Sequence, residues 1–231
     1  MNGPWAEGPK ELMQHAIDHL SEGGDFDRRI AMISIDNAVE LMIKTFLGLP
    51  RRARGSDGPT RKELENSFNS FPSLLDLIEK YAEEKLTGVS LEEIEWYHRL
   101  RNQLYHSGNG ITVELSKVET YLSLAKVLYE SLFESSLDIK ASSPIEKKLG
   151  VFLGKWGMFD KEFRKQLPPK DGPALYWKRD YLESISAEAA ELWMELNQFR
   201  NFAVHTLENV TEKEFDEAMP KLDKLIKYIE K

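Results

Sequence analysis

Apolar residues recur at helical spacing through most of this 231-residue chain, and that periodicity restricts its fold more than any other feature. On one face of an α-helix apolar residues return after three or four positions, whereas in a strand they alternate every second position. Alternating runs rich in Val, Ile and Thr are nearly absent. The pattern therefore predicts an all-α protein.

The predicted helices end where glycine, proline or polar clusters interrupt the apolar pattern. Their ranges are 9–22, 25–47, 73–85, 90–106, 112–135, 145–166, 186–205 and 212–230, with a loop rich in glycine, proline and arginine over 48–59. A polar stretch over residues 135–144, ending in Pro144, is the best candidate for a domain boundary. It predicts a first helical bundle over residues 1–137 and a second over 138–231.

Composition limits the class of protein and its chemistry. No apolar stretch is long enough to cross a bilayer and no secretory signal is evident, so a cytoplasmic protein without membrane contact is expected. The chain has no cysteine, which excludes disulfides, zinc–thiolate sites and a thiol nucleophile. Its net charge of -8 opposes nonspecific binding of nucleic acid over the whole surface, so any such contact must be local.

A six-residue motif, Arg-Asn-x-x-x-His, occurs at residues 101–106 (the first sextet) and again at 200–205 (the second sextet). Each sextet closes an amphipathic helix and is followed by a short turn. After the turn, a hydroxyl residue is predicted to be the N-cap of the last helix of each copy: Thr112 in the first copy and Thr211 in the second. Glu214 lies three residues after Thr211, as in a capping box. The chain is therefore predicted to contain two diverged tandem copies of one unit.

The residue types of the sextet suit RNA cleavage without a metal. A guanidinium can bind a phosphate through two parallel hydrogen bonds, and an imidazole with a pKa of about 6.5 can transfer protons at neutral pH. Attack by the 2′-hydroxyl of RNA requires one group to accept its proton and another to protonate the leaving oxygen. Because one sextet has one imidazole, two sextets facing each other would make a more complete site.

The sextet resembles the Arg-polar-x-x-x-His signature of the HEPN superfamily, and residues 28–44 are similar to the second helix of such domains. The resemblance covers most of residues 9–134 and extends over 145–231. It implies two tandem HEPN-like helical bundles that form an intramolecular pseudo-dimer, and a metal-independent endoribonuclease that needs no cofactor. The catalytic positions that it implies are Arg101, His106, Arg200 and His205, with Asn102 and Asn201 in supporting positions.

Many members of this superfamily act in toxin–antitoxin, abortive-infection or other defence systems. The resemblance thus implies an RNA substrate, an antitoxin or defence-system partner protein, and pairing of two chains as a homodimer where one copy alone is active. Ser107 and Thr206 stand where one toxin branch has a tyrosine that its antitoxin modifies. Two alternatives remain open: a catalytically inactive HEPN interaction or regulatory subunit whose sextets hold the two halves together, and a nucleotide-binding regulator.

Further polar residues are candidates for supporting roles. Asp36 and Glu40 could orient Arg101 across the bundle, or could simply cover the solvent face of their helix. The second copy has no clear match to this pair. A cluster of basic residues in the predicted loop could contact an RNA backbone, or could be an ordinary charged loop; it includes Arg51, Arg52 and Arg54.

One pair of histidines has the spacing of metal ligands. His15 and His19 are four residues apart and so share a helix face. No third ligand is marked in the sequence, so a solvated helix surface is the better interpretation and no metal site is predicted.

Overall fold

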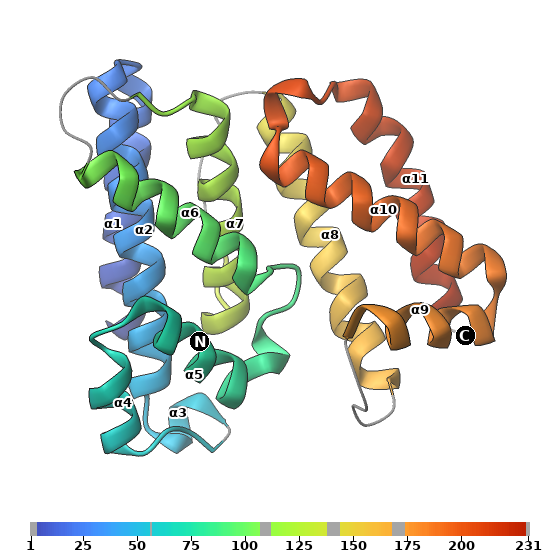
Figure 1. Cartoon of the computed structure of the whole chain (residues 1–231), viewed down its shortest axis with the longest axis horizontal. Coiled ribbons are helices and arrows are strands. Elements are labelled where there is room, and N and C mark those ends of the chain that lie inside the picture. Colours follow the sequence, from blue (N-terminus) through green and yellow to red (C-terminus); the bar gives the residue numbers. More distant parts are fainter. Residues whose placement is uncertain (1–3, 56, 107–111, 138–143, 168–173, 230–231) are drawn as a thin grey trace.

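The computed structural model describes residues 4–55, 57–106, 112–137, 144–167 and 174–229, and every regular element in these ranges is a helix (Figure 1). The predicted all-α class is confirmed. The first part of the chain, called the N-terminal half below, contains η1 (Pro4–Ala6), α1 (Glu7–Glu22), α2 (Asp25–Gly48), α3 (Arg51–Arg54), α4 (Arg61–Ser67), α5 (Phe71–Ala82), η2 (Glu83–Lys85), α6 (Leu91–His106) and α7 (Leu115–Phe133). The C-terminal half contains α8 (Pro144–Gln166), α9 (Ala174–Ile185), α10 (Ala187–His205), η3 (Leu207–Asn209) and α11 (Glu212–Ile229).

Most predicted helices are found with ends shifted by a few residues, and the differences have local causes. The predicted loop over residues 48–59 contains the single helical turn α3, and Thr112 is not an N-cap because α7 begins at Leu115 with Glu114 before it. The apolar pattern predicted neither α4, which has seven residues, nor α9, which follows a segment rich in proline and glycine. Yet α4 begins with a capping box between Thr60 and Glu63, which is a sequence signal in its own right.

Two other helix ends that were predicted from capping residues are confirmed. Gly23 ends α1 in the left-handed conformation, at φ 78°, which glycine adopts without steric cost. At the start of α11 the Glu214 backbone N–H donates to Thr211 Oγ1 at 3.4 Å, while the Thr211 backbone N–H donates to Glu214 Oε2 at 2.7 Å. These reciprocal bonds form the predicted capping box.

Helix α7 lies in the middle of the molecule and joins the two halves. In the N-terminal half α2 packs along α1 and also contacts α5, α6 and α7; in the C-terminal half α11 packs against α8 and α10. Helix α7 contacts both α2 and α8 (Figure 1). It is buried around much of its circumference, since the consecutive residues 118–122 are all buried.

The hydrophobic core is continuous through both halves. The predicted boundary at residues 135–144 falls between α7 and α8, and residues 138–143 of it lie outside the described residues. Among the described helices, none combines the length and the apolar character that a membrane span requires.

Candidate functional site

Arg101 of the first sextet lies near the C-terminal end of α6 and is held by three side chains. Its Nε is 3.2 Å from Asp36 Oδ2, Nη2 donates to Asn37 Oδ1 at 2.7 Å, and Nη1 donates to Asn102 Oδ1 at 2.9 Å. The Arg101 side chain keeps 20% of its surface exposed, whereas the Asp36 carboxylate is fully buried. The guanidinium is therefore fixed in direction but still reaches the surface, and Asp36 and Asn102 occupy the supporting positions expected of them.

The Asp36 carboxylate is also bonded to two side chains that the sequence did not point to. Nδ1 of His98 lies 3.0 Å from Asp36 Oδ2, and the Tyr121 hydroxyl donates to Asp36 Oδ1 at 2.9 Å. Burial, and then the nearby Asp36 charge, raise the pKa of the Tyr121 hydroxyl well above its ordinary value, so Tyr121 stays a neutral donor. The sequence signal for His98 is its position three residues before Arg101 on the same helix; Tyr121 has none.

Glu40 and His106 were also expected near Arg101. Glu40 accepts a hydrogen bond from Lys44, one turn further along α2. His106 is the last residue of α6, and its side chain lies outside the described residues.

Arg200 of the second sextet is buried in an ion pair between the two halves. Its Nη1 and Nη2 donate to Glu93 Oε1 and Oε2 at 2.6 and 2.8 Å, a two-pronged pairing between α10 and α6. Nη2 also donates to the backbone carbonyl of Gly88 at 3.1 Å, and Nη1 to Asn201 Oδ1 at 3.1 Å. Both charged side chains are only 5% exposed. This guanidinium is thus engaged within the protein and turned away from solvent.

His205 lies against α6, on the partly exposed side of the same contact. Its ring meets the edge of Trp96 with centroids 5.3 Å apart. Next to it, the buried Tyr97 hydroxyl donates to the backbone carbonyl of Val204 at 2.7 Å, and the Tyr97 ring stacks on Tyr121 at 4.6 Å. The end of α10 is therefore anchored on the middle of α6.

The described residues do not bring the two sextets into one cluster. Among the described contacts, Arg101 is bonded to side chains of α2 and α6, and Arg200 to side chains of α6 and α10, and no side chain is bonded to both. Glu93 and Arg101 are eight residues apart on α6, which corresponds to about 12 Å along the helix axis. A phosphate held by Arg101 would therefore not meet the Arg200 guanidinium in this arrangement.

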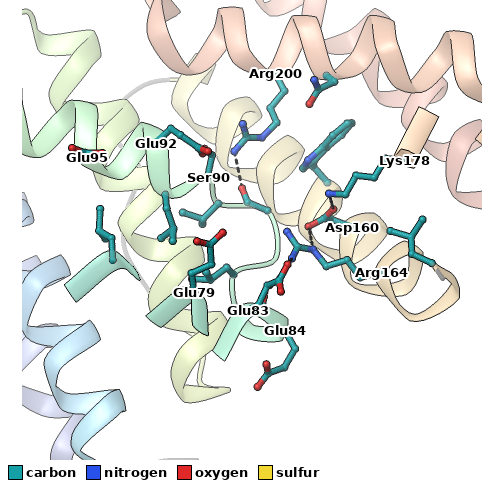
Figure 2. A pocket seen from close by; sticks show the side chains of 18 of the residues that line it. Glu79, Glu83, Glu84, Ser90, Glu92, Glu95, Asp160, Arg164, Lys178 and Arg200 are labelled. Carbon is teal, nitrogen blue, oxygen red and sulfur yellow. Dashed lines mark hydrogen bonds and ion pairs between the residues drawn. The ribbon is translucent and has the colours of Figure 1, made fainter. Parts of the chain in front are cut away.

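A cleft of about 710 Å³ opens between the two halves, lined by α5, η2, the segment before α6, the first part of α6, α8, α9 and α10. Figure 2 shows Arg200 at its edge, pointing from α10 toward the segment before α6. That segment comes very close to α8: Gly88 has φ +78°, and a Cβ there would lie 2.8 Å from Gly157 Cα. The absence of a side chain at Gly88 thus permits the contact that places its carbonyl within reach of Arg200.

The cleft carries excess negative charge. Its cationic side chains are paired: Arg164 Nε lies 2.8 Å and Lys178 Nζ 3.3 Å from the two oxygens of Asp160, and Arg200 pairs with Glu93. The acidic side chains that line it are Asp76, Glu79, Glu83, Glu84, Glu92, Glu95 and Asp160 (Figure 2). A hydrogen bond from Ser90 lowers the pKa of Glu92, which keeps that group ionised at neutral pH. This surface repels a phosphate backbone.

The basic cluster of the predicted loop lies on α3, at the far end of α2 from Asp36. Arg51 is exposed and 3.3 Å from Asp57, Arg52 is exposed, and Arg54 Nη1 donates to the backbone carbonyl of Leu47 at 2.7 Å. Asp36 is twelve residues, or about 18 Å of helix, from Gly48, where α2 ends before α3 begins. The cluster is therefore separate from Arg101.

The described residues contain no group of three or more side chains arranged to hold a metal ion. Of the two histidines at metal-ligand spacing, His19 bonds through Nδ1 to Asp27 at 2.9 Å, and His15 contacts the His19 ring edge-on.

Comparisons with protein-family models, with curated proteins and with solved structures return no match. The functional argument for this chain therefore rests on its own residues and their geometry.

Proposed function

We propose that this chain is a metal-independent endoribonuclease of the HEPN type whose reactive groups belong to the first sextet. In this proposal Arg101 binds the scissile phosphate, His106 transfers a proton, and the second copy is a scaffold in an intramolecular pseudo-dimer. The proposal extends to a cytoplasmic protein of a toxin–antitoxin or defence system, with an antitoxin or defence protein as partner.

The observation that carries the proposal is the way Arg101 is held. Asp36, Asn37 and Asn102 fix its guanidinium while leaving it at the surface, one and a half turns before His106. An arginine that is already oriented loses less side-chain freedom when it binds a phosphate than a mobile one does. In this proposal Arg200 does not bind phosphate, because both Nη atoms of its guanidinium already donate to the Glu93 carboxylate in a buried site.

The test compares the same substitution in both sextets. His106→Asn should lower the rate of RNA cleavage in EDTA by about 100-fold or more, the usual contribution of a proton-transfer group. His205→Asn, the matched control, should stay within a few-fold of the unchanged protein. Products should end in 2′,3′-cyclic phosphate, and DNA should remain intact because it lacks the 2′-hydroxyl.

Two results would overturn the proposal. One is activity that disappears with EDTA and returns with Mg²⁺, because 2′-hydroxyl attack needs no metal-bound water. The other is an equal loss of activity in both histidine variants, which would assign the second sextet a catalytic part as well.

A second candidate function is a catalytically inactive interaction subunit. The Arg200–Glu93 ion pair favours it, since one sextet is already used to join the two halves. That function requires pure protein to leave RNA uncleaved at every pH and to bind a partner protein through a surface that the histidine substitutions do not disturb.

A further inference from the structure

His98 has the surroundings of a proton-transfer group. Its Nδ1 lies 3.1 and 3.0 Å from the two oxygens of the fully buried Asp36 carboxylate. A carboxylate beside the Arg101 guanidinium accepts hydrogen bonds, so the Nδ1 position carries the proton in this contact. In a neutral imidazole with this tautomer, the other ring nitrogen, Nε2, has a lone pair that can accept a proton.

The imidazole ring of His98 is also fixed in orientation. It stacks on Phe71 with ring centroids 3.9 Å apart and planes 10° from parallel. Its side chain nevertheless keeps 14% of its surface exposed. Nδ1 faces a buried carboxylate and one face of the ring is covered by Phe71, so the ring has one orientation relative to Asp36.

Along α6, Arg101 lies between His98 and His106. Arg101 follows His98 by three residues and precedes His106 by five, which corresponds to about 4.5 and 7.5 Å along the helix axis. His98 and Arg101 both contact Asp36, His98 through Nδ1 and Arg101 through Nε, and both lie within 3.2 Å of its Oδ2. A phosphate on Arg101 would thus have a histidine before it and another after it along the helix.

We propose that His98 is the general base of the first-sextet site, an inference that rests on the proposed ribonuclease function. His98 Nε2 takes the proton of the 2′-hydroxyl as its oxygen bonds to phosphorus. The P–O5′ bond then breaks, and a protonated His106 gives its proton to the leaving 5′-oxygen. The products are a 2′,3′-cyclic phosphate and a 5′-hydroxyl, and proton exchange with water restores both histidines. One chain then supplies both proton-transfer groups without His205.

The chain offers a matched control for this role. His19 bonds through Nδ1 to Asp27 at 2.9 Å, with side chains 25% and 23% exposed, at the junction of α1 and α2. This is a second histidine–aspartate pair that is remote from Arg101. His19→Gln and His98→Gln therefore remove the same kind of contact, and only one of them belongs to the inferred site.

The experiment measures cleavage of an oligoribonucleotide in EDTA across a pH series. His98→Gln should lower kcat by about 100-fold or more, change KM little, and remove the acidic limb of the pH–rate profile, since a base must be deprotonated to act. His19→Gln should leave kcat, KM and the profile unchanged. A His98→Gln protein that keeps its rate within about threefold and its acidic limb would overturn the inference.

A substrate with sulfur in the bridging 5′ position separates the two histidines, because this leaving group needs no protonation. It should restore most of the rate to His106→Asn and little to His98→Gln; the reverse pattern would overturn the assignment of the base. If His98→Gln does not fold, as judged by circular dichroism, the pH–rate profile of His106→Asn on this substrate still tests whether His98 is the base. Its profile must retain the acidic limb that belongs to His98, and a profile without that limb overturns the inference.

These results also separate the inference from the proposed function. An unchanged protein that leaves RNA intact, or a rate that does not depend on His106, means that the proposed function has failed. Cleavage that depends on His106 but is indifferent to His98→Gln means that only the role of His98 has failed.

Discussion

The ion pair between Arg200 and Glu93 should hold the two halves of the molecule together. Arg200→Met would remove two hydrogen bonds to Glu93 and one to the Gly88 carbonyl, and would leave a carboxylate that is only 5% exposed without its cation. Removing one partner of a buried ion pair costs about 3–5 kcal/mol. Since 1 kcal/mol shifts the Tm of a domain of this size by about 2–4 °C, the expected drop is about 6–20 °C.

Calorimetry on two further variants tests whether burial is the cause. Arg99→Met is the control, because Arg99 pairs with Glu95 on the same helix but is 71% exposed, and an exposed pair contributes only about 0–1 kcal/mol. Adding Glu93→Leu to Arg200→Met should recover most of the lost Tm, since it removes the stranded charge. If Arg200→Met lowers the Tm no more than Arg99→Met does, or if the double variant recovers nothing, the reasoning is wrong.

The same double variant tests whether Arg200 of the second sextet is needed for RNA cleavage. It lacks the Arg200 guanidinium but should be folded, so a scaffold role predicts RNA cleavage at a rate close to that of the unchanged protein. A folded but inactive double variant would instead place Arg200 in the reaction.

Two further predictions concern the stability of the fold. Tyr97→Phe leaves the buried carbonyl of Val204 without its hydroxyl donor and should lower the free energy of unfolding by about 1–3 kcal/mol; an unchanged urea midpoint would contradict this. Hydrogen bonds, the largest from Lys80, lower the pKa of Glu63 from its ordinary 4.5 to about 2. Because the folded value lies below the unfolded one, this stabilisation is present above about pH 4.5 and is lost as the pH falls toward 2. Glu63→Gln should weaken the acid dependence of Tm, and a Glu63 carboxyl that titrates at its ordinary value in NMR would refute the prediction.

Much of the local structure could be predicted from the sequence, because helix formation and capping depend on residues that are close together in the chain. The 3.6-residue period marks the main helices, Gly23 marks the end of α1, and Thr211 with Glu214 marks the start of α11. The pattern missed α3 and α4, which are too short to show a clear period, and α9, which directly follows the Pro168-Pro169 and Gly172-Pro173 pairs that indicated a break in the chain.

The candidate site could be predicted only in part for the same physical reason. The sequence determined that Arg101 and Arg200 each lie near the end of an amphipathic helix. Because the two sextets share the same residue pattern, that pattern does not indicate that the two arginines have different surroundings. Periodicity tells which side of a helix faces inward, not which helix it meets. Only the side-chain contacts between α10 and α6 bury Arg200 on Glu93, 107 residues away. Likewise, only the packing of α2 against α6 and α7 brings Asp36 to Arg101, His98 and Tyr121. The tertiary structure therefore decided which arginine is an internal ion-pair partner and which one remains at the surface.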